Sequence, residues 1–424
     1  MAMGKRYTDL LAGFIGNVVE WYDFALYGYM AGILSELFFP GENTTAALIA
    51  TYGIFAAGFL MRPLGSAVFG WLGDTFGSGR TMVISITMMV LPTFLLGCLP
   101  TFATAGLWSP LLLVVVRLVQ GLSVGGEFSS SVTYLVETAP ADRRGFSGSW
   151  ANVGSMVGML LGSGVAATLT TWLSADTVLA WGWRLPFLLG SVTGIGGAAI
   201  MLRLKLPHSP HFQRHRRERP ATSPLLQAFT TNRREMVQAI VFASAYGVIF
   251  YIPLVYLPEW LHSQTGMARD TALSLNTAAT ALLVVLIPIS GWLSDRFFRR
   301  TRFIAGAMLL MAMLVIPLYM RLASDGVWMA VTVQFVLVVL LAVPLGSAPA
   351  MFVELFPARD RLSGYSVAYN LGMGVVGGTT PMLATWLIQA TGQAVAPAGL
   401  LAAVALAACL VTTWMHDASR EPLR

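Results

Sequence analysis

The stretch Gly70-Trp71-Leu72-Gly73-Asp74 recurs 221 residues later as Gly291-Trp292-Leu293-Ser294-Asp295. A second stretch, ETAPADRR at 137–144, recurs 217 residues later as ELFPARDR at 354–361. Two separate matches at nearly the same offset indicate an internal duplication rather than chance. The sequence therefore predicts a chain built from two related halves.

Each half consists of apolar blocks long enough to cross a bilayer. Of the 424 residues, 56% are hydrophobic and 11% charged, whereas a soluble domain has about 25% charged residues. A spanning helix needs roughly 20 largely apolar residues, and the chain supplies about twelve such blocks. Their breaks fall near Gly41, Ser78, Ala105, Asp142, Asp176, His215, Met267, Arg299, Ser324, Arg359 and Gln393.

The repeated stretches are separated by an even number of spans, so both halves should have the same orientation in the membrane. Parallel repeats of this kind suit a solute site between them and alternating access from the two sides. We therefore expect an all-α membrane protein with twelve transmembrane helices in two six-helix bundles. The predicted domains are a bundle at 1–204, a linker at 205–232 and a bundle at 233–424.

The formal net charge of +6 reflects basic residues placed at the termini and in alternate connections, most densely at 203–234. This is the positive-inside pattern. It predicts a multi-pass protein of a bacterial-type inner membrane with both termini in the cytoplasm, and it explains the charge without a nucleic-acid partner. The bilayer is the expected surrounding, and a monomer is the expected functional unit.

Motifs for soluble chemistry do not occur in the sequence. The cysteines, Cys98 and Cys409, lie in apolar blocks and indicate neither a disulfide nor a metal cluster. His208, His211 and His215 lie in a basic, Pro-flanked linker, which repels cations. There is no phosphate-binding Gly-Lys motif and no nucleophile elbow. We expect no enzyme activity, no catalytic residue, no metal and no cofactor, with a proton gradient as the driving force.

Ionisable residues inside the apolar blocks are the candidate functional groups, because each costs roughly 3 kcal/mol or more at bilayer depth. The first block places polar residues along one helical face, and the fourth block does the same within an arc of about 80°. The first stripe comprises Asn17, Glu20, Asp23 and Tyr27, and the second comprises Arg117, Gln120 and Glu127. A purely structural ion pair is the alternative interpretation of these charges.

Charged residues at the helix ends form a second candidate set. Asp74 and Asp295, beside the repeated glycines, suggest ion pairs that hold the cytoplasmic side shut. Their expected partners are arginines at opposite helix ends, and Glu137 and Glu354 belong to the same predicted network. The full predicted cytoplasmic gate is Asp74, Arg80, Glu137, Arg143, Arg144, Asp295, Glu354 and Arg361, with Arg359 as a further possible partner.

Several stretches resemble a known family. The segment 70–80 is similar to the loop G-x-L-x-D-R-x-G-R-R of the major facilitator superfamily, although Thr75 replaces an Arg and Ser78-Gly79 adds a residue before Arg80. Four further stretches resemble the metabolite:proton symporter family within it, which carries citrate and other di- or tricarboxylates, 2-oxoglutarate, shikimate, and proline or betaine. They are GNVVEWYDF at 16–24, RPLG at 62–65, RLVQGLSVGGE at 117–127 and WGWRLPF at 181–187. The family's Glu-Ser/Thr-Pro element appears here as His208-Ser209-Pro210.

This resemblance implies roles for the polar stripes. Asp23 and Arg117 match a carboxylate–arginine pair that related sugar porters use for proton coupling, with Glu20 or Glu127 as the second candidate. Helices one, four and eleven line the cavity in the family, which makes Arg117, Asn17, Tyr27, Gln120, Tyr369 and Asn370 the predicted substrate-binding residues. The second half offers mainly neutral polar and aromatic side chains to this cavity.

The expected function is proton-coupled symport of a small organic acid, a mono-, di- or tricarboxylate. One cation, Arg117, is predicted at the midplane beside two or three carboxylates, which favours a solute with one or two acidic groups. Osmosensing relatives carry a long charged C-terminal extension, and the chain ends about nine residues after its last apolar block. The alternative is symport of a zwitterionic osmolyte such as proline or betaine; a membrane sensor without transport is a third possibility.

Overall fold

A computed structural model describes residues 2–41, 44–203, 229–322 and 326–423, and within these ranges the regular structure is helical throughout. The predicted linker therefore lies outside the described residues except for 229–232. The first half contains α1 (Ala2–Phe38), α2 (Thr44–Phe76), α3 (Ser78–Cys98), α4 (Phe102–Ala105), α5 (Trp108–Thr138), α6 (Arg144–Trp172), α7 (Ala175–Thr177), η1 (Val178–Gly182) and α8 (Arg184–Arg203).

The second half repeats this order with two interrupted helices. Its elements are α11 (Arg233–Tyr251), η3 (Ile252–Tyr256), α12 (Leu257–Thr265), α13 (Arg269–Arg296), α14 (Arg300–Leu322), α15 (Gly326–Leu355), α16 (Arg361–Tyr369), η4 (Asn370–Gly377), α17 (Gly378–Thr391) and α18 (Ala396–Trp414). The segments η3 and η4 are π-helical and join their neighbours into two long spans. Pro253 lies in η3, where its missing N–H disturbs the regular α-helical hydrogen bonding.

Ten helices of the described chain are long and apolar enough to cross a membrane, and the pair Ala175–Gly182 and Arg184–Ile200, bent by 49°, makes an eleventh. The twelfth helix of the fold is α1, with 37 residues. Its apolar run is interrupted by Glu20 and Asp23, which lowers its hydropathy. The expected all-α membrane fold of two six-helix bundles is confirmed.

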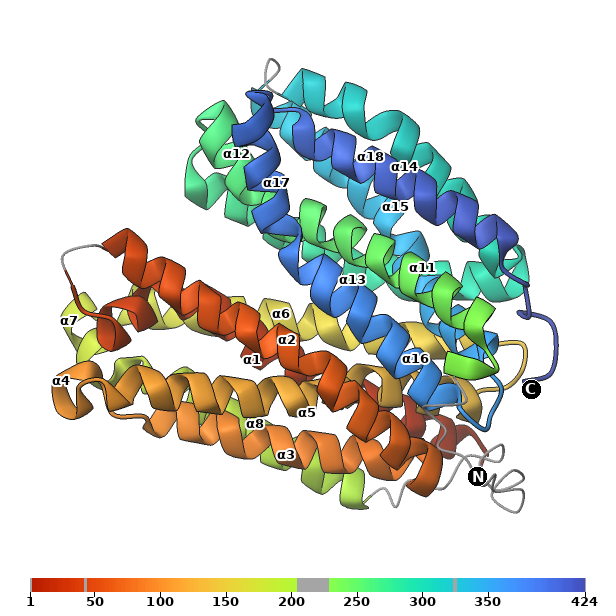
Figure 1. The fold of residues 1–424 in the computed structure, drawn as a ribbon, viewed down its shortest axis with the longest axis horizontal. Coiled ribbons are helices and arrows are strands. Elements are labelled where there is room, and N and C mark those ends of the chain that lie inside the picture. The colour runs from red at the N-terminus through yellow and green to blue at the C-terminus, as the bar shows by residue number, and fades with distance from the viewer. Residues whose placement is uncertain (1, 42–43, 204–228, 323–325, 424) are drawn as a thin grey trace.

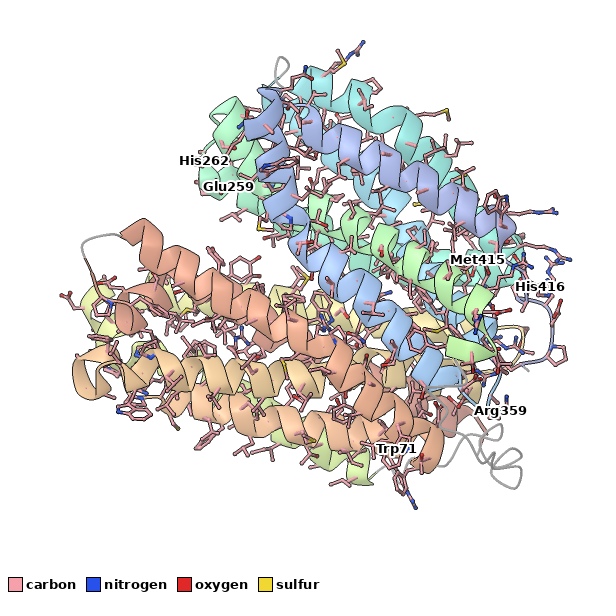
Figure 2. The ribbon with its side chains drawn as sticks, in the orientation of Figure 1. Trp71, Glu259, His262, Arg359, Met415 and His416 are labelled. Carbon is pink, nitrogen blue, oxygen red and sulfur yellow. The ribbon has the colours of Figure 1, made fainter. Side chains whose placement is uncertain are left out.

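The two bundles form a V (Figure 1). They meet where the N- and C-termini lie, called here the termini end, and diverge toward the far end, which carries α4, α7 and α12. The contacts between halves pair α6 with α13 and α15, and α2 with α16 and η4. Figure 2 shows Arg359 and His416 at the termini end and Glu259 and His262 at the far end. This structure is therefore closed at the termini end.

Helices α2 and α5 approach each other through glycines. A Cβ atom added to Gly121 would lie 2.0 Å from the Gly58 carbonyl oxygen, and one added to Gly65 would lie 2.0 Å from the Leu122 carbonyl oxygen. Small residues let helix backbones come close where lipid supplies no hydrophobic drive. This contact fixes the position of α2, and with it Arg62, relative to α5.

Replacing Gly121 by alanine should destabilise the protein, because the added methyl group must push one backbone away from the other. Overpacking of this kind costs about 1–3 kcal/mol, so we expect a lower thermal unfolding midpoint in detergent. Gly164 is the matched control, since a Cβ atom there meets nothing within 4 Å. Equal midpoints for the two alanine variants would contradict this account of the contact.

Candidate functional site

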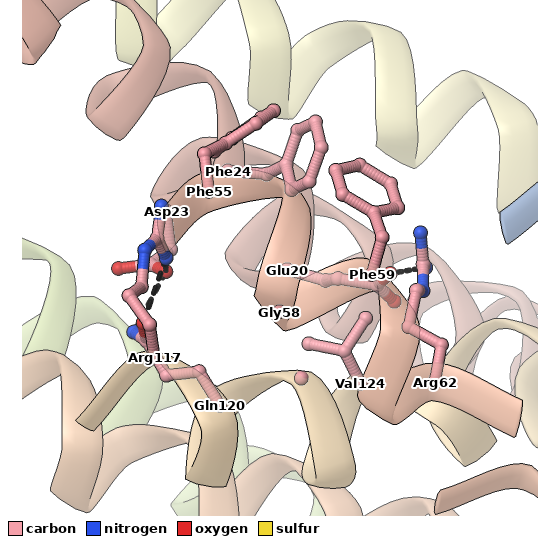
Figure 3. A pocket seen from close by; sticks show the side chains of 11 residues that line it. Glu20, Asp23, Phe24, Phe55, Gly58, Phe59, Arg62, Arg117, Gln120 and Val124 are labelled. Carbon is pink, nitrogen blue, oxygen red and sulfur yellow. Dashed lines mark hydrogen bonds and ion pairs between the residues drawn. The ribbon is translucent and has the colours of Figure 1, made fainter. Parts of the chain in front are cut away.

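A pocket in the first half is lined by α1, α2 and α5 (Figure 3). Its charged lining consists of two carboxylates and two arginines, and its apolar wall is aromatic. The lining residues are Glu20, Asp23, Phe24, Phe55, Gly58, Phe59, Arg62, Arg117, Gln120, Gly121 and Val124. The charged side chains are almost fully buried, so each needs a partner inside the protein.

The predicted pair of Asp23 and Arg117 is formed. Arg117 Nη1 lies 3.3 Å from Asp23 Oδ2. Gln120 bridges them, since its amide donates to Asp23 Oδ2 at 2.8 Å and its carbonyl accepts from Arg117 Nη1 at 2.7 Å. The guanidinium also lies 3.6 Å from the centroid of the Tyr27 ring, a cation–π contact. The spacing along α1 and α5 brings these four residues together as the sequence predicted.

A second ion pair was not expected from the sequence. Arg62 on α2 donates from Nη2 to Glu20 Oε1 at 2.7 Å. The expectation of a single midplane cation is therefore wrong, because α2 turns Arg62 into the protein and not toward lipid. The sequence did carry a signal, an arginine within the apolar run of α2, directly before Pro63.

The two pairs leave polar atoms of both signs without partners. Among the described residues, no hydrogen-bond partner exists for two carboxylate oxygens, Glu20 Oε2 and Asp23 Oδ1. The same holds for donors on Arg62 (Nε) and Arg117 (Nε and Nη2). Unpaired buried groups are costly. The pocket is therefore suited to a ligand that offers both donors or positive charge and acceptors or negative charge.

Four of the predicted substrate-binding residues do not line this pocket; Tyr27 only contacts its Arg117, and Asn17, Tyr369 and Asn370 lie further away. Asn17 donates to the Gly13 carbonyl and to Ser131 Oγ, each at 2.7 Å. Asn370 donates to the Gly125 carbonyl across the two halves at 2.7 Å. Tyr369 stacks on Phe128 across the halves, with ring centroids 4.8 Å apart. In this closed state these residues join helices together, and their role in solute binding remains a prediction.

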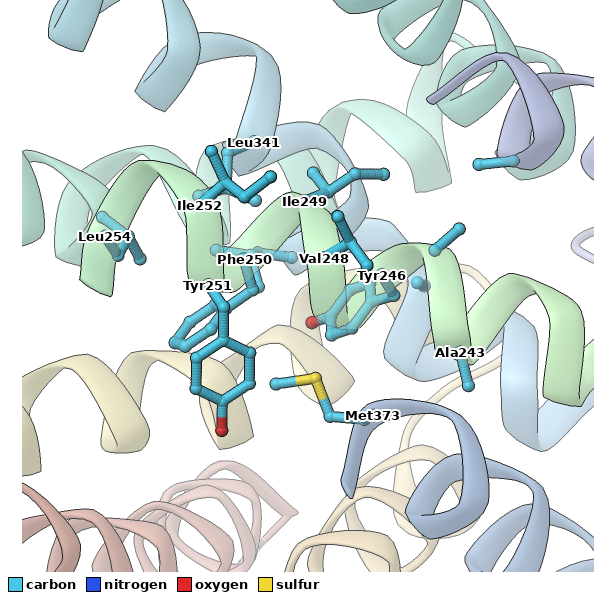
Figure 4. Packing of buried hydrophobic residues seen from close by; sticks show 14 of the residues in the cluster. Ala243, Tyr246, Val248, Ile249, Phe250, Tyr251, Ile252, Leu254, Leu341 and Met373 are labelled. Carbon is cyan, nitrogen blue, oxygen red and sulfur yellow. The ribbon is translucent and has the colours of Figure 1, made fainter. Parts of the chain in front are cut away.

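The second half faces the pocket region with aromatic rings. Figure 4 shows Phe250 and Tyr251 on α11 among the buried apolar side chains around Met373. The Tyr251 ring centroid lies 6.4 Å from that of Phe59, and the Phe250 centroid lies 5.5 Å from that of Trp21. As the sequence indicated, the first half carries the buried ion pairs of the pocket and the second half adds neutral aromatic surface.

The repeated aspartates at the termini end cap helices of the opposite half. Asp74 accepts hydrogen bonds from the backbone N–H groups of Leu362 and Ser363 at 3.0 and 2.9 Å. Asp295 accepts from those of Gly145 and Phe146, both at 2.8 Å. Helix N-termini have free N–H groups and a positive dipole end. The expectation of an arginine partner is therefore wrong for Asp74, which accepts its hydrogen bonds from backbone amides at the start of α16.

The repeated stretches 137–144 and 354–361 each contribute a glutamate and an arginine, which form ion pairs between the two halves. Arg361 donates to Glu137 Oε1 at 2.7 Å, and Arg144 lies 3.5 Å from Glu354 Oε1. Each arginine thus meets the glutamate of the other half. Arg300, which was not predicted, binds both Glu354 oxygens at 2.9 and 3.0 Å and Asp295 Oδ1 at 2.8 Å.

These contacts between the halves at the termini end are called here the latch. The two remaining predicted gate residues, Arg143 and Arg80, do not take part in it. Arg143 is exposed and lies 3.9 Å from its neighbour Asp142. Arg80 is exposed, and its side chain makes no hydrogen bond or ion pair with the described residues. Arg300 begins α14 as Arg80 nearly begins α3, so the two are counterparts. The extra residue at Ser78-Gly79 shifts Arg80 out of the equivalent position.

The segment after α18 crosses the latch. Its Glu421 carbonyl accepts a hydrogen bond from Arg144 at 2.8 Å, and Asp417 caps α14 by accepting from the Thr301 N–H at 3.0 Å. Burial raises the pKa of Asp417, but hydrogen bonds from Ser419 and Thr301 outweigh this and hold the pKa below its ordinary value. Asp417 is therefore ionised at neutral pH, as its capping role requires.

Residues 10–241 match a family described as "Sugar (and other) transporter", and residues 254–424 match one described as "Major Facilitator Superfamily". Among curated relatives, a "Proline/betaine transporter" of Salmonella typhimurium is 33% identical, with 99% of this chain and 85% of the relative covered. The "Glycine betaine/proline/ectoine/pipecolic acid transporter OusA" of Dickeya dadantii is 32% identical, with the same shares covered.

Solved structures resemble the whole chain. The proton:xylose symporter XylE bound to 6-bromo-6-deoxy-D-glucose superposes with a TM-score of 0.84 at 19% identity, covering 100% of this chain and 98% of that one. The transporter FucP in the outward conformation gives 0.69 at 14% identity, covering 95% and 98%. At such identities the likeness concerns the fold alone.

Proposed function

Since this chain belongs to the major facilitator superfamily of membrane transporters, we propose that it is a proton-coupled symporter that imports a zwitterionic osmolyte such as proline or betaine. It is a transporter of a small solute and not an enzyme, in keeping with its relatives. The names of those relatives favour the zwitterion over the organic acid that the sequence alone suggested.

The observation that carries the proposal is the pair of ion pairs in one pocket. The solute carboxylate would meet the free donors of Arg62 or Arg117, while its cationic nitrogen would meet Glu20 or Asp23. The aromatic wall of Phe24, Phe55 and Phe59 adds π-faces that attract a cation. A di- or tricarboxylate would use the donors but would be repelled by both carboxylates, which makes it the poorer fit.

Uptake into proteoliposomes with an imposed pH gradient tests the substrate class. We expect accumulation of labelled proline or betaine and no comparable accumulation of citrate, 2-oxoglutarate or shikimate. Accumulation of citrate, 2-oxoglutarate or shikimate without accumulation of proline or betaine would favour the organic acid as the substrate.

The proposed coupling uses Asp23 and Arg117. Arg117 cannot lose its proton, so Asp23 stays ionised while the pair is intact. A solute carboxylate that competes for Arg117 frees Asp23, whose affinity for a proton then rises. Solute binding and proton binding thereby depend on each other, and both bias the equilibrium between the two open states.

Replacing Asp23 by asparagine should abolish proton-driven accumulation, because asparagine cannot exchange a proton. We expect uptake to stop at the external concentration, a loss of the whole gradient, while exchange of labelled for unlabelled solute continues at a reduced rate. The measurement compares both modes in the same proteoliposomes. A variant that still accumulates solute as the parent does would sink the assignment of Asp23.

The orientation proposed is a bacterial inner-membrane protein with the termini end in the cytoplasm, supported by the basic residues at that end. In that orientation the present structure is closed to the cytoplasm. The protein is proposed to act as a monomer without a cofactor. A reporter enzyme that works only outside the cytoplasm should therefore be inactive when it is fused to either terminus. Activity of such a fusion would contradict this orientation.

A further inference from the structure

Glu127 on α5 is a buried carboxyl without a compensating charge among the described residues. Its exposed fraction is 1%, and neither carboxyl oxygen has a hydrogen-bond partner in the described part of the chain. Glu20 and Asp23, in contrast, each pair with an arginine. An ionised carboxylate without a partner is strongly disfavoured in a low-dielectric interior. The surroundings of Glu127 therefore favour its neutral, protonated form.

The groups that face Glu127 support the same form. Gly16 of α1 makes room for it, since a Cβ atom there would lie 2.1 Å from Glu127 Oε1. Glu20, also on α1, is a second acidic group near Glu127, and its negative charge would repel an ionised Glu127. Ser85 of α3 faces it too, but the Ser85 hydroxyl already donates to the Ser123 carbonyl at 2.7 Å. While it makes that hydrogen bond, the Ser85 hydroxyl cannot also donate to Glu127, so it leaves a Glu127 carboxylate without stabilisation.

Glu127 lies between the pocket and the termini end. It follows Gln120 by seven residues along α5, which is about 10 Å at 1.5 Å per residue. At this level the two halves are in contact, through Asn370 and the Gly125 carbonyl at 2.7 Å and through Ser129 and Ser366 at 2.8 Å. Opening of the termini end must separate these contacts, so the same movement that releases solute changes the surroundings of Glu127.

We propose that Glu127 is a second proton-binding site of the carrier, loaded while the termini end is closed and emptied when that end opens. The inference rests on the proposed proton symport and adds a site to it. In loading, a hydronium ion gives its proton to one carboxylate oxygen of Glu127 and becomes water. In release, that O–H bond breaks, the proton passes to water at the termini end, and the carboxylate remains. Asp23 stays ionised by Arg117 during loading, so the two acids act in sequence.

The variant Glu127→Gln tests the site, because glutamine has the shape of the protonated acid and cannot release a proton. We expect exchange of labelled betaine to persist and the proton-to-solute ratio, measured from the pH gradient that balances a solute gradient, to fall by about one. Ser130→Ala is the matched control, since Ser130 is a buried neutral residue one turn along α5. It should keep the ratio of the parent.

An unchanged ratio in Glu127→Gln would overturn the proposal, and so would loss of exchange in a folded variant, because Glu127 would then serve the solute. Infrared spectroscopy of the purified full chain gives a readout independent of transport. The parent at neutral pH should show the C=O band of a protonated, buried carboxyl, and Ser85→Ala should shift it. A parent without that band would refute the assignment. Absence of betaine or proline exchange in the parent would count against the proposed solute but would leave the infrared result standing.

Discussion

Replacing Arg300 by alanine is expected to open the carrier at its termini end. Arg300 is 1% exposed and binds both Glu354 oxygens as well as Asp295. Its loss leaves two buried carboxylates short of positive charge in the closed state, a loss of about 3–5 kcal/mol for a broken buried pair. When that end opens, water solvates the same carboxylates. The ratio of open to closed molecules should therefore rise roughly 150- to 5,000-fold.

Accessibility of a buried cysteine measures this shift. Ser366→Cys, in a chain whose Cys98 and Cys409 are replaced by serine, places a thiol at the contact between the halves, where Ser366 is fully buried. A reagent applied from the termini side should modify it far faster when Arg300 is alanine. Uptake should lose rate more than affinity, because the pocket lies elsewhere.

Arg80→Ala is the matched control, since Arg80 is the exposed counterpart of Arg300 in the first half. We expect its modification rate to equal that of the parent. Equal rates for the Arg300 and Arg80 variants would mean that the helix caps made by Asp74 and Asp295 hold the end closed without Arg300.

Replacing Arg62 by glutamine is expected to abolish high-affinity solute binding. The change leaves Glu20 as a buried carboxylate without its cation and removes a donor for the solute carboxylate. The hydrogen bond lost between the guanidinium and the solute carboxylate is worth about 1.5–3 kcal/mol, which corresponds to roughly a 10- to 150-fold loss of affinity for proline or betaine. Titration calorimetry on the purified variant measures it directly.

A double variant separates folding from binding at this site. Glu20→Gln combined with Arg62→Gln removes both charges, and replacing a buried pair as a unit is often close to neutral for stability. We expect the double variant to unfold near the parent temperature and still to bind weakly. If Arg62→Gln bound the solute within a few-fold of the parent, Arg62 would be a structural partner of Glu20 only.

Helical periodicity and the family resemblance predicted the contact between Asp23 and Arg117 because both residues lie on polar stripes. They did not predict Arg62, because whether a lone polar residue faces lipid or protein depends on how α2 crosses its neighbours. The partners of Asp74 were missed for a different reason. Backbone N–H groups at the start of α16 carry no side-chain signature, so a search for arginines could not find them.

Small differences between the two repeats limited how many of the other contacts between the halves could be predicted from the sequence. A single added residue before Arg80 keeps it from making the contacts that Arg300 makes with Glu354 and Asp295. The offset between the repeats does not show which of the two arginines makes such contacts. Tyr369 and Asn370 illustrate a further limit. A residue that lines the cavity of a family can join the two halves in one state, as these two do here, and the sequence does not say which state a structure represents.

The crosswise pairing of Glu137 with Arg361 and of Glu354 with Arg144 also bears on biogenesis. When the first half emerges from the ribosome and enters the bilayer, its latch charges still lack the partners that lie more than 200 residues further along the chain. Until the second half is inserted, these groups must stay hydrated at the membrane surface. A chain without its second half would therefore expose these charged groups at the membrane surface, whereas in the complete fold the contacts between the halves bury them.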